Sequence, residues 1–249
     1  HSVLKKAESL GVKGRVFNSL KAKLGSANLA ISEVALQTIT DLVGQNKHKE
    51  VVEYSSHLLL DFPNSVFILN STATALSQLK RFDEAIKTYK RVLLINPNLA
   101  EAINNMGTCF LEMGNVDEAL KNYKIALKIN PQFATALNNL GNAYKFCGNL
   151  SSAIRTYDKA LKIRPDYPEA IMNQSFAYLA QRNFLEGWKR YEHRLNVKSL
   201  TLTKAEIPIK PKWKPGLSGN VLLWAEQGLG DVIMFASMIP ELYEHADTL

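Results

Sequence analysis

The sequence has few cysteines and no long hydrophobic run, and these absences exclude several classes of protein. Of its 249 residues only Cys109 and Cys147 are cysteines, and they have neither metal-ligand spacing nor a cluster of partner ligands. We interpret them as thiols in a reducing compartment, and so expect a cytoplasmic protein without a bound metal. No apolar run reaches the roughly 18 residues that span a bilayer, and no signal-peptide pattern is present. We therefore expect no membrane span.

Acidic residues are fewer than basic ones, but the resulting positive charge is not spread along the chain. The formal net charge is +7, and residues 196–219 alone hold five lysines and one acid, Glu206. A nucleic-acid-binding protein should instead carry a basic face on its folded part. A basic surface with aromatic side chains that stack on bases is also lacking. We therefore expect no nucleic-acid partner.

The sequence does contain a step of 34 residues, at which prolines, tyrosines and small residues recur. The three columns are Pro63, Pro97, Pro131 and Pro165; Tyr89, Tyr123, Tyr157 and Tyr191; and Ala85, Ala119, Ala153 and Gly187. A period of this length marks a solenoid, and 34 residues is the period of a helix-turn-helix repeat. The predicted fold class is therefore all-α, with repeats at 32–65, 66–99, 100–133, 134–167 and 168–199. Residues 1–31 are expected to form a capping helix or degenerate repeat.

Each column has a packing role in this prediction. Small residues such as Gly107 and Gly141 let the two helices of a repeat approach closely, and the tyrosines fill the space between repeats. The prolines end each unit, because proline cannot continue a helix. A single unit cannot bury its apolar faces alone, so only the stack is stable.

These residues resemble the tetratricopeptide repeat (TPR) family. Its pattern is met in the fourth unit by Leu137, Leu140, Gly141, Tyr144, Ala153, Tyr157 and Pro165. The resemblance covers about two-thirds of the chain and is strongest in the second to fourth repeats. It implies a superhelical solenoid whose first helices line a concave groove that binds protein or peptide partners.

Asparagines recur on the predicted first helices and are the candidate binding residues. Asn105, Asn139 and Asn173 lie 34 apart, with Ser71 one step earlier; Asn104 and Asn138 lie beside them, and Asn142 is a turn beyond. Each asparagine offers two donors and an acceptor, so a column of them can bind the backbone of an extended peptide. The TPR superhelix of the O-GlcNAc transferases carries a similar ladder. The alternative is that these asparagines are polar surface residues or shape the helix locally.

The basic residues Lys87, Lys121, Arg155 and Lys189 form a second ladder, on the predicted second helices. We interpret it as a solvated outer face, with acidic partners three residues earlier at three of the four positions. Lysines and arginines are missing from the matching groove positions, which argues against a clamp for C-terminal carboxylates.

The pattern changes near the C-terminus. Residues 200–219 read as a linker rich in proline and lysine, and 220–225 as a buried strand. Gly228 and Gly230 then lie in a loop that ends at Asp231, before a predicted helix. Strand, glycine loop and helix are typical of the start of an α/β domain, which we expect over 220–249.

With Trp188 and the linker, this segment resembles bacterial TPR–glycosyltransferase proteins, whose catalytic part is a heptosyltransferase-like GT-B fold. The resemblance implies that Asp231 is a general base and that a full-length enzyme uses a nucleotide-sugar donor. A GT-B enzyme has two Rossmann-like domains, whereas the match ends after one strand and one helix. We therefore expect this chain alone to bind no cofactor and to catalyse no transfer.

Three hypotheses about function remain. The first is an interaction module that recruits partners for a larger glycosyltransferase-like protein. The second is that the full-length protein is an active glycosyltransferase that acts on a protein or glycan acceptor. The third is a self-assembling TPR scaffold, which would be a homo-oligomer.

Overall fold

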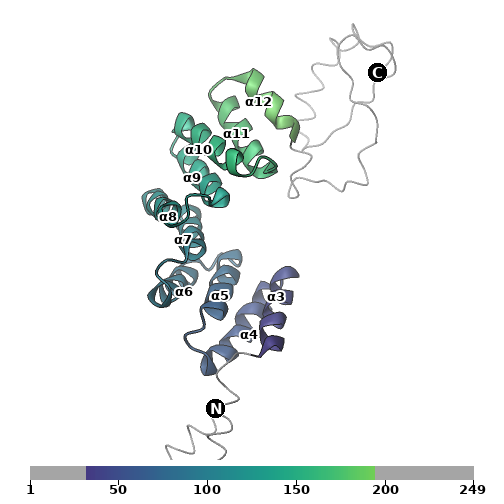
Figure 1. Cartoon of the computed structure of the whole chain (residues 1–249), viewed down its shortest axis with the longest axis vertical. Coiled ribbons are helices and arrows are strands. Elements are labelled where there is room, and N and C mark those ends of the chain that lie inside the picture. The colour runs from purple at the N-terminus through teal and green to yellow at the C-terminus, as the bar shows by residue number, and fades with distance from the viewer. Residues whose placement is uncertain (1–31, 194–249) are drawn as a thin grey trace, which may run out of the picture. The chain divides into compact units, whose positions relative to one another are not determined.

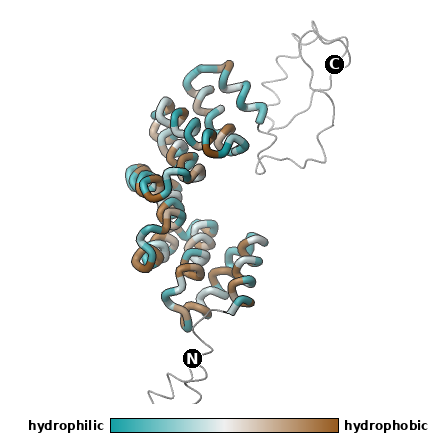
Figure 2. The backbone as a smooth tube through the Cα atoms, viewed as in Figure 1, coloured by the Kyte–Doolittle hydropathy of each residue, from teal (hydrophilic) through white to brown (hydrophobic). Residues whose placement is uncertain are grey.

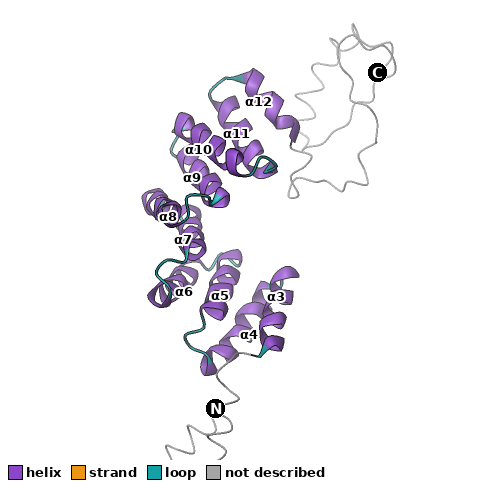
Figure 3. Cartoon of the chain, viewed as in Figure 1, coloured by secondary structure: helices purple, strands orange, loops and turns teal. Residues whose placement is uncertain are grey.

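The computed structural model describes residues 32–193, which form ten α-helices joined by short turns (Figure 1). The helices are α3 (Glu33–Gly44), α4 (His48–Asp61), α5 (Val66–Gln78), α6 (Phe82–Ile95), α7 (Ala100–Glu112), α8 (Val116–Ile129), α9 (Ala134–Phe146), α10 (Leu150–Ile163), α11 (Pro168–Ala180) and α12 (Phe184–Tyr191). Between residues 32 and 193 there is no strand (Figure 3). This confirms the all-α prediction. The segments predicted at 1–31, 200–219 and 220–249 lie outside the described residues.

The helices follow the 34-residue step. First helices begin at Val66, Ala100, Ala134 and Pro168, and second helices at His48, Phe82, Val116, Leu150 and Phe184. Consecutive pairs form five helical hairpins that succeed one another within one compact unit of the chain, which ends at Tyr191. The predicted helix-turn-helix repeats are therefore present.

Each hairpin turns at the same position of its repeat, where the backbone is left-handed. Asn46, Lys80, Gly114, Gly148 and Arg182 have φ of 56°, 60°, 78°, 73° and 62°. Glycine adopts this conformation without strain, whereas a lysine or arginine does so at a cost. The chain therefore imposes the turn even where the local residue does not favour it.

Packing of the helices explains why small residues and tyrosines recur at the 34-residue step. Tyr89, Tyr123 and Tyr157 are fully buried in the core. A Cβ atom placed on Gly107 would lie 2.9 Å from a ring carbon of Tyr123, and one on Gly141 would lie 2.5 Å from the Tyr157 ring. Glycine at these positions therefore makes room for the tyrosine of the second helix. Hydrophobic and hydrophilic turns alternate along the helices, as expected when only some faces are buried (Figure 2).

No described helix is long and apolar enough to cross a membrane.

Candidate functional site

The first helices α3, α5, α7, α9 and α11 form the inner face of the stack. Each contacts the next first helix across the repeat boundary, and the described second helices have no comparable contact with one another. A stack that is closer on one side curves toward that side. The asparagine columns lie on this inner face, on α7, α9 and α11.

Asparagines of successive repeats are hydrogen-bonded to one another. The Nδ2 of Asn139 donates to the Oδ1 of Asn104 over 3.1 Å, and the Nδ2 of Asn173 donates to the Oδ1 of Asn138 over 3.1 Å. Each bond joins a first helix to the first helix before it. We call these two bonds the amide rungs.

The two asparagine columns therefore have different roles. Asn104 and Asn138 are only 2% and 5% exposed, so they are not open to a ligand, contrary to the expectation that they line the groove. Asn105, Asn139 and Asn173 are half-buried. The buried column holds the half-buried column in place. This role depends on the twist between repeats, so the sequence alone did not predict it.

The amide rungs fix which group of each half-buried asparagine remains available. They use the Nδ2 of Asn139 and Asn173, and no other described residue bonds to the Oδ1 of either side chain. Each amide thus presents a carbonyl acceptor and one remaining N–H in a held orientation. Pre-orientation lowers the entropy that is lost when a ligand binds.

The rung is missing one repeat earlier. The Oδ1 of Asn70, which corresponds to Asn104, is buried without a partner in the described residues. Asn105 instead accepts a bond of 3.1 Å from the Nδ2 of Asn104. Ser71, at the corresponding position of α5, is half-buried. Two complete rungs therefore lie between the third and fifth repeats.

A second polar column on the inner face binds the buried tyrosines. The hydroxyls of Tyr89, Tyr123 and Tyr157 contact Thr74 Oγ1 at 3.0 Å, Thr108 Oγ1 at 3.2 Å and Asn142 Oδ1 at 2.7 Å. Burial raises the pKa of Tyr89 and Tyr123 to about 12, and it raises the pKa of Tyr157 as well.

Because its carbonyl accepts from Tyr157, the amide N–H groups of Asn142 are the donors that it keeps for other partners. Partner and tyrosine are separated by 15 residues in all three pairs. This constant spacing is visible in the sequence and could have predicted the pairs.

Aromatic side chains lie beyond the asparagines, toward the end of the stack. Phe146 is 67% exposed and Phe176 is 41% exposed. The Lys145 ammonium lies 5.5 Å from the centre of the Phe176 ring, and burial lowers the pKa of Lys145. This part of the inner face therefore offers apolar surface next to one positive charge.

The predicted catalytic residue Asp231 and the glycines of the predicted loop, Gly228 and Gly230, lie outside the described residues, so their roles stay predictions. Between residues 32 and 193 no group of three or more histidine, cysteine, aspartate or glutamate residues could hold a metal ion.

Comparison with known proteins agrees with the architecture. Three TPR family models match, described as "TPR repeat" over residues 107–145 and "Tetratricopeptide repeat" over residues 134–167 and 76–124. Residues 76–167 therefore match tetratricopeptide repeats, and the described helical hairpins pack like those of a TPR solenoid. Comparison with curated proteins gives no match.

Solved structures show the same fold. A crystal structure of MamA is 20% identical, with a TM-score of 0.55 over 67% of this chain and 95% of that chain. MamA 41-end from Desulfovibrio magneticus RS-1 is also 20% identical, with a TM-score of 0.55 over 69% and 97%. PilF of Pseudomonas aeruginosa is 16% identical, with a TM-score of 0.58 over 65% and 73%. TPR solenoids with an open inner face serve in protein interaction, and this supports that general role for the chain.

Proposed function

We propose that the inner face binds an extended peptide segment of a partner protein, mainly through the peptide backbone. The observation that carries the proposal is the pair of amide rungs. They hold Asn139 and Asn173 so that each keeps a carbonyl acceptor without a partner among residues 32–193. A peptide backbone supplies the N–H groups that such acceptors need.

The spacing suits an extended chain. Packed helices lie about 10 Å apart, and an extended peptide covers that distance in about three residues. Amides on successive first helices would therefore meet every third peptide group or so. Asn142 adds donor groups for the peptide carbonyls. Because none of these contacts involves a peptide side chain, we expect little sequence preference along this part of the groove.

Side-chain preference would arise at Phe146, Phe176 and Lys145. Two partly exposed rings beside a single ammonium favour an apolar or acidic side chain at one end of the bound segment. These side-chain contacts would add sequence preference to the backbone contacts of the asparagines, which do not depend on the peptide sequence.

The test compares two double variants of the full chain by their binding to an array of random-sequence peptides. Asn139→Ala with Asn173→Ala removes the groove amides and the rungs together. Asn104→Ala with Asn138→Ala removes the same two rungs but keeps the groove amides. Two lost hydrogen bonds of about 1 kcal/mol each predict a weakening of roughly 10–30-fold for the first pair and a smaller effect for the second.

Peptides N-methylated along the backbone provide an independent probe, because they keep their side chains but lose the N–H groups. They should bind the unaltered chain less tightly than their parent peptides. Equal binding of methylated and parent peptides, or equal losses in the two double variants, would show that the groove amides do not bind the backbone.

The wider setting of this interaction follows from the sequence alone. We infer that the groove recruits a protein to a larger glycosyltransferase-like protein, on the basis of the residues around Asp231. The recruiting role of the asparagines does not depend on that inference, because the groove residues named above all lie within residues 66–180.

A further inference from the structure

The stack also has a cleft on its outer side, between the second helices α8 and α10. This outer cleft is lined by Leu127, Leu137, Tyr144, Lys159, Lys162 and Ile163, among others, and has a volume of about 470 Å³. Its floor consists mainly of apolar side chains of α8, α9 and α10 that are buried or half-buried, with Thr156 as a polar member. Lys159 and Lys162 stand exposed at its edge.

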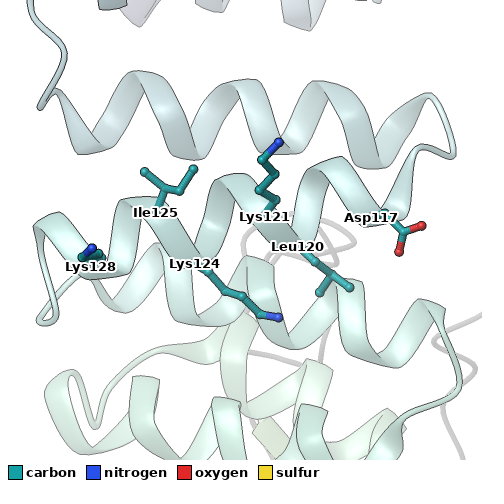
Figure 4. Close-up of a pocket in the computed structure, with 6 residues that line it drawn as sticks. All are labelled: Asp117, Leu120, Lys121, Lys124, Ile125 and Lys128. Carbon is teal, nitrogen blue, oxygen red and sulfur yellow. The ribbon is translucent and has the colours of Figure 1, made fainter.

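A second hollow adjoins it along α8. Figure 4 shows its lining residues Asp117, Leu120, Lys121, Lys124, Ile125 and Lys128, which all project from that one helix. The Lys124 ammonium lies 6.0 Å from the centre of the Tyr144 ring, which lines the outer cleft. Lys124 therefore links the two hollows, because it lines the one along α8 and its ammonium lies over a ring that lines the outer cleft.

This surface carries positive charge that the described protein leaves uncompensated. Lys124, Lys128, Lys159 and Lys162 form no ion pair with any residue between 32 and 193, whereas Lys121 pairs with Glu118. They also do not belong to the 34-residue ladder of Lys87, Lys121, Arg155 and Lys189. At the corresponding positions of α6, Lys90 and Arg91 are also basic, whereas Leu94 stands where α8 has Lys128 and α10 has Lys162.

We propose that the outer cleft is a second interaction surface, which takes an acidic segment of a partner protein that also bears apolar side chains. Charge complementarity selects Asp and Glu for the four lysines. The recessed floor requires an apolar side chain that can enter it. A membrane surface or a nucleic-acid duplex would meet the lysines but would leave the floor unfilled, so a protein segment fits both features better.

The experiment uses the full chain and a labelled synthetic peptide in which leucines at helical i, i+3 and i+4 spacing are surrounded by glutamates. Lys159→Glu with Lys162→Glu should weaken binding about tenfold, because two attractions become repulsions. The matched control is Lys49→Glu with Lys90→Glu, which changes the net charge equally at two exposed lysines outside the cleft. The control should stay within about twofold, and binding should weaken as salt is added.

Further measurements test which kind of partner occupies the outer cleft. A peptide of identical composition with its leucines dispersed should bind less tightly, and Asn139→Ala with Asn173→Ala should leave binding of the acidic peptide unchanged. Circular dichroism of each variant establishes that the helices are intact. Equal effects of the two lysine pairs, equal binding of the two peptides, or no saturable binding of either peptide would overturn the proposal. Tighter binding to phosphatidylserine vesicles or duplex DNA than to the peptide would overturn it as well.

Discussion

The half-buried asparagines of the inner face depend on buried asparagines in the preceding repeat. Asn139 and Asn173 donate to Asn104 and Asn138, and the acceptors are almost completely removed from water. A buried amide without partners would be costly, so the bond stabilises both the packing and the orientation of the exposed amide. Asparagine thus has a structural role at one position of the helix and is the proposed binding residue at the adjacent position.

Glycine at position 141 is required by the ring of Tyr157, and this gives a residue-scale prediction. In Gly141→Ala the new methyl group would lie 2.5 Å from that ring, and the ring is fully buried and cannot move aside. We expect the substitution to lower the free energy of unfolding by about 1–3 kcal/mol, despite the better helix propensity of alanine. Thermal or urea unfolding measures the change.

Two other glycines serve as references. Gly107→Ala should destabilise less, since its methyl group would lie 2.9 Å from the Tyr123 ring. Gly44 ends α3 and has no atom near the place of an added methyl group, so Gly44→Ala should be neutral or slightly stabilising. If Gly141→Ala proved as stable as Gly44→Ala, the packing explanation of the small column would fail.

At the scale of helices, the sequence predicted the repeats well because each repeat is specified locally. The turn at Gly114 and the proline that follows each of the second helices α4, α6, α8 and α10 can be read from a single unit, and the structure has them where the period places them. The use of Lys80 and Arg182 at the left-handed turn position could be inferred only by aligning them with Gly114 and Gly148.

Contacts between repeats could not be read in the same way. Gln174 is fully buried where earlier repeats have Leu140 and Met106. It donates to Asp158 Oδ1 over 2.6 Å and accepts from Arg190 Nε over 2.8 Å, so its partners lie on α10 and α12. Such a polar cluster depends on how three helices pack together, which a single repeat does not reveal. The outer cleft between α8 and α10 could not be predicted for the same reason.

Unequal burial along the stack predicts unequal stability of its helices. Only Ala35 and Ile39 of α3, and only Val51 and Ser55 of α4, are buried, whereas α7 and α9 each bury six residues. In a linear stack each repeat is stabilised by its neighbours, so poorly buried repeats open first.

Native-state hydrogen exchange of the full chain tests this gradient. Amides of α7 to α10 should exchange most slowly, and those of α3 and α4 should exchange through a local opening of lower free energy. Exchange of all ten described helices at one common free energy would contradict the gradient and indicate that the stack opens as a single unit.

At the scale of the whole solenoid, the inner amides and the outer lysines face different sides of the same helical hairpins. The third to fifth repeats carry both the amide rungs and the outer cleft, yet the two sets of residues come from different helix faces. If both proposals hold, a partner in the groove leaves the outer cleft accessible, and the repeats can hold two protein segments at once.

Because of the buried tyrosines at the 34-residue step, the stability of the whole stack should fall as the pH rises in the alkaline range. Burial raises the pKa of Tyr89 and Tyr123 to about 12 from the ordinary value of 10.0. A group whose pKa is raised by folding stabilises the folded state below its unfolded pKa, and this contribution is lost as the pH rises through the folded pKa. Each of the two tyrosines should therefore contribute about 2–3 kcal/mol that disappears between about pH 10 and pH 12.

Since the total stability of a domain is typically about 5–15 kcal/mol, the loss of these contributions should cause cooperative alkaline unfolding in that window. Helical circular dichroism and tyrosinate absorbance, followed together, should show the buried tyrosines ionising only as the helices unfold. Tyr123→Phe removes one of these ionisations and also the hydrogen bond to Thr108. It should therefore shift the midpoint of alkaline unfolding to higher pH, while the stability at neutral pH falls slightly. Ionisation of every tyrosine before any loss of helix would show that the column does not link the stack to pH.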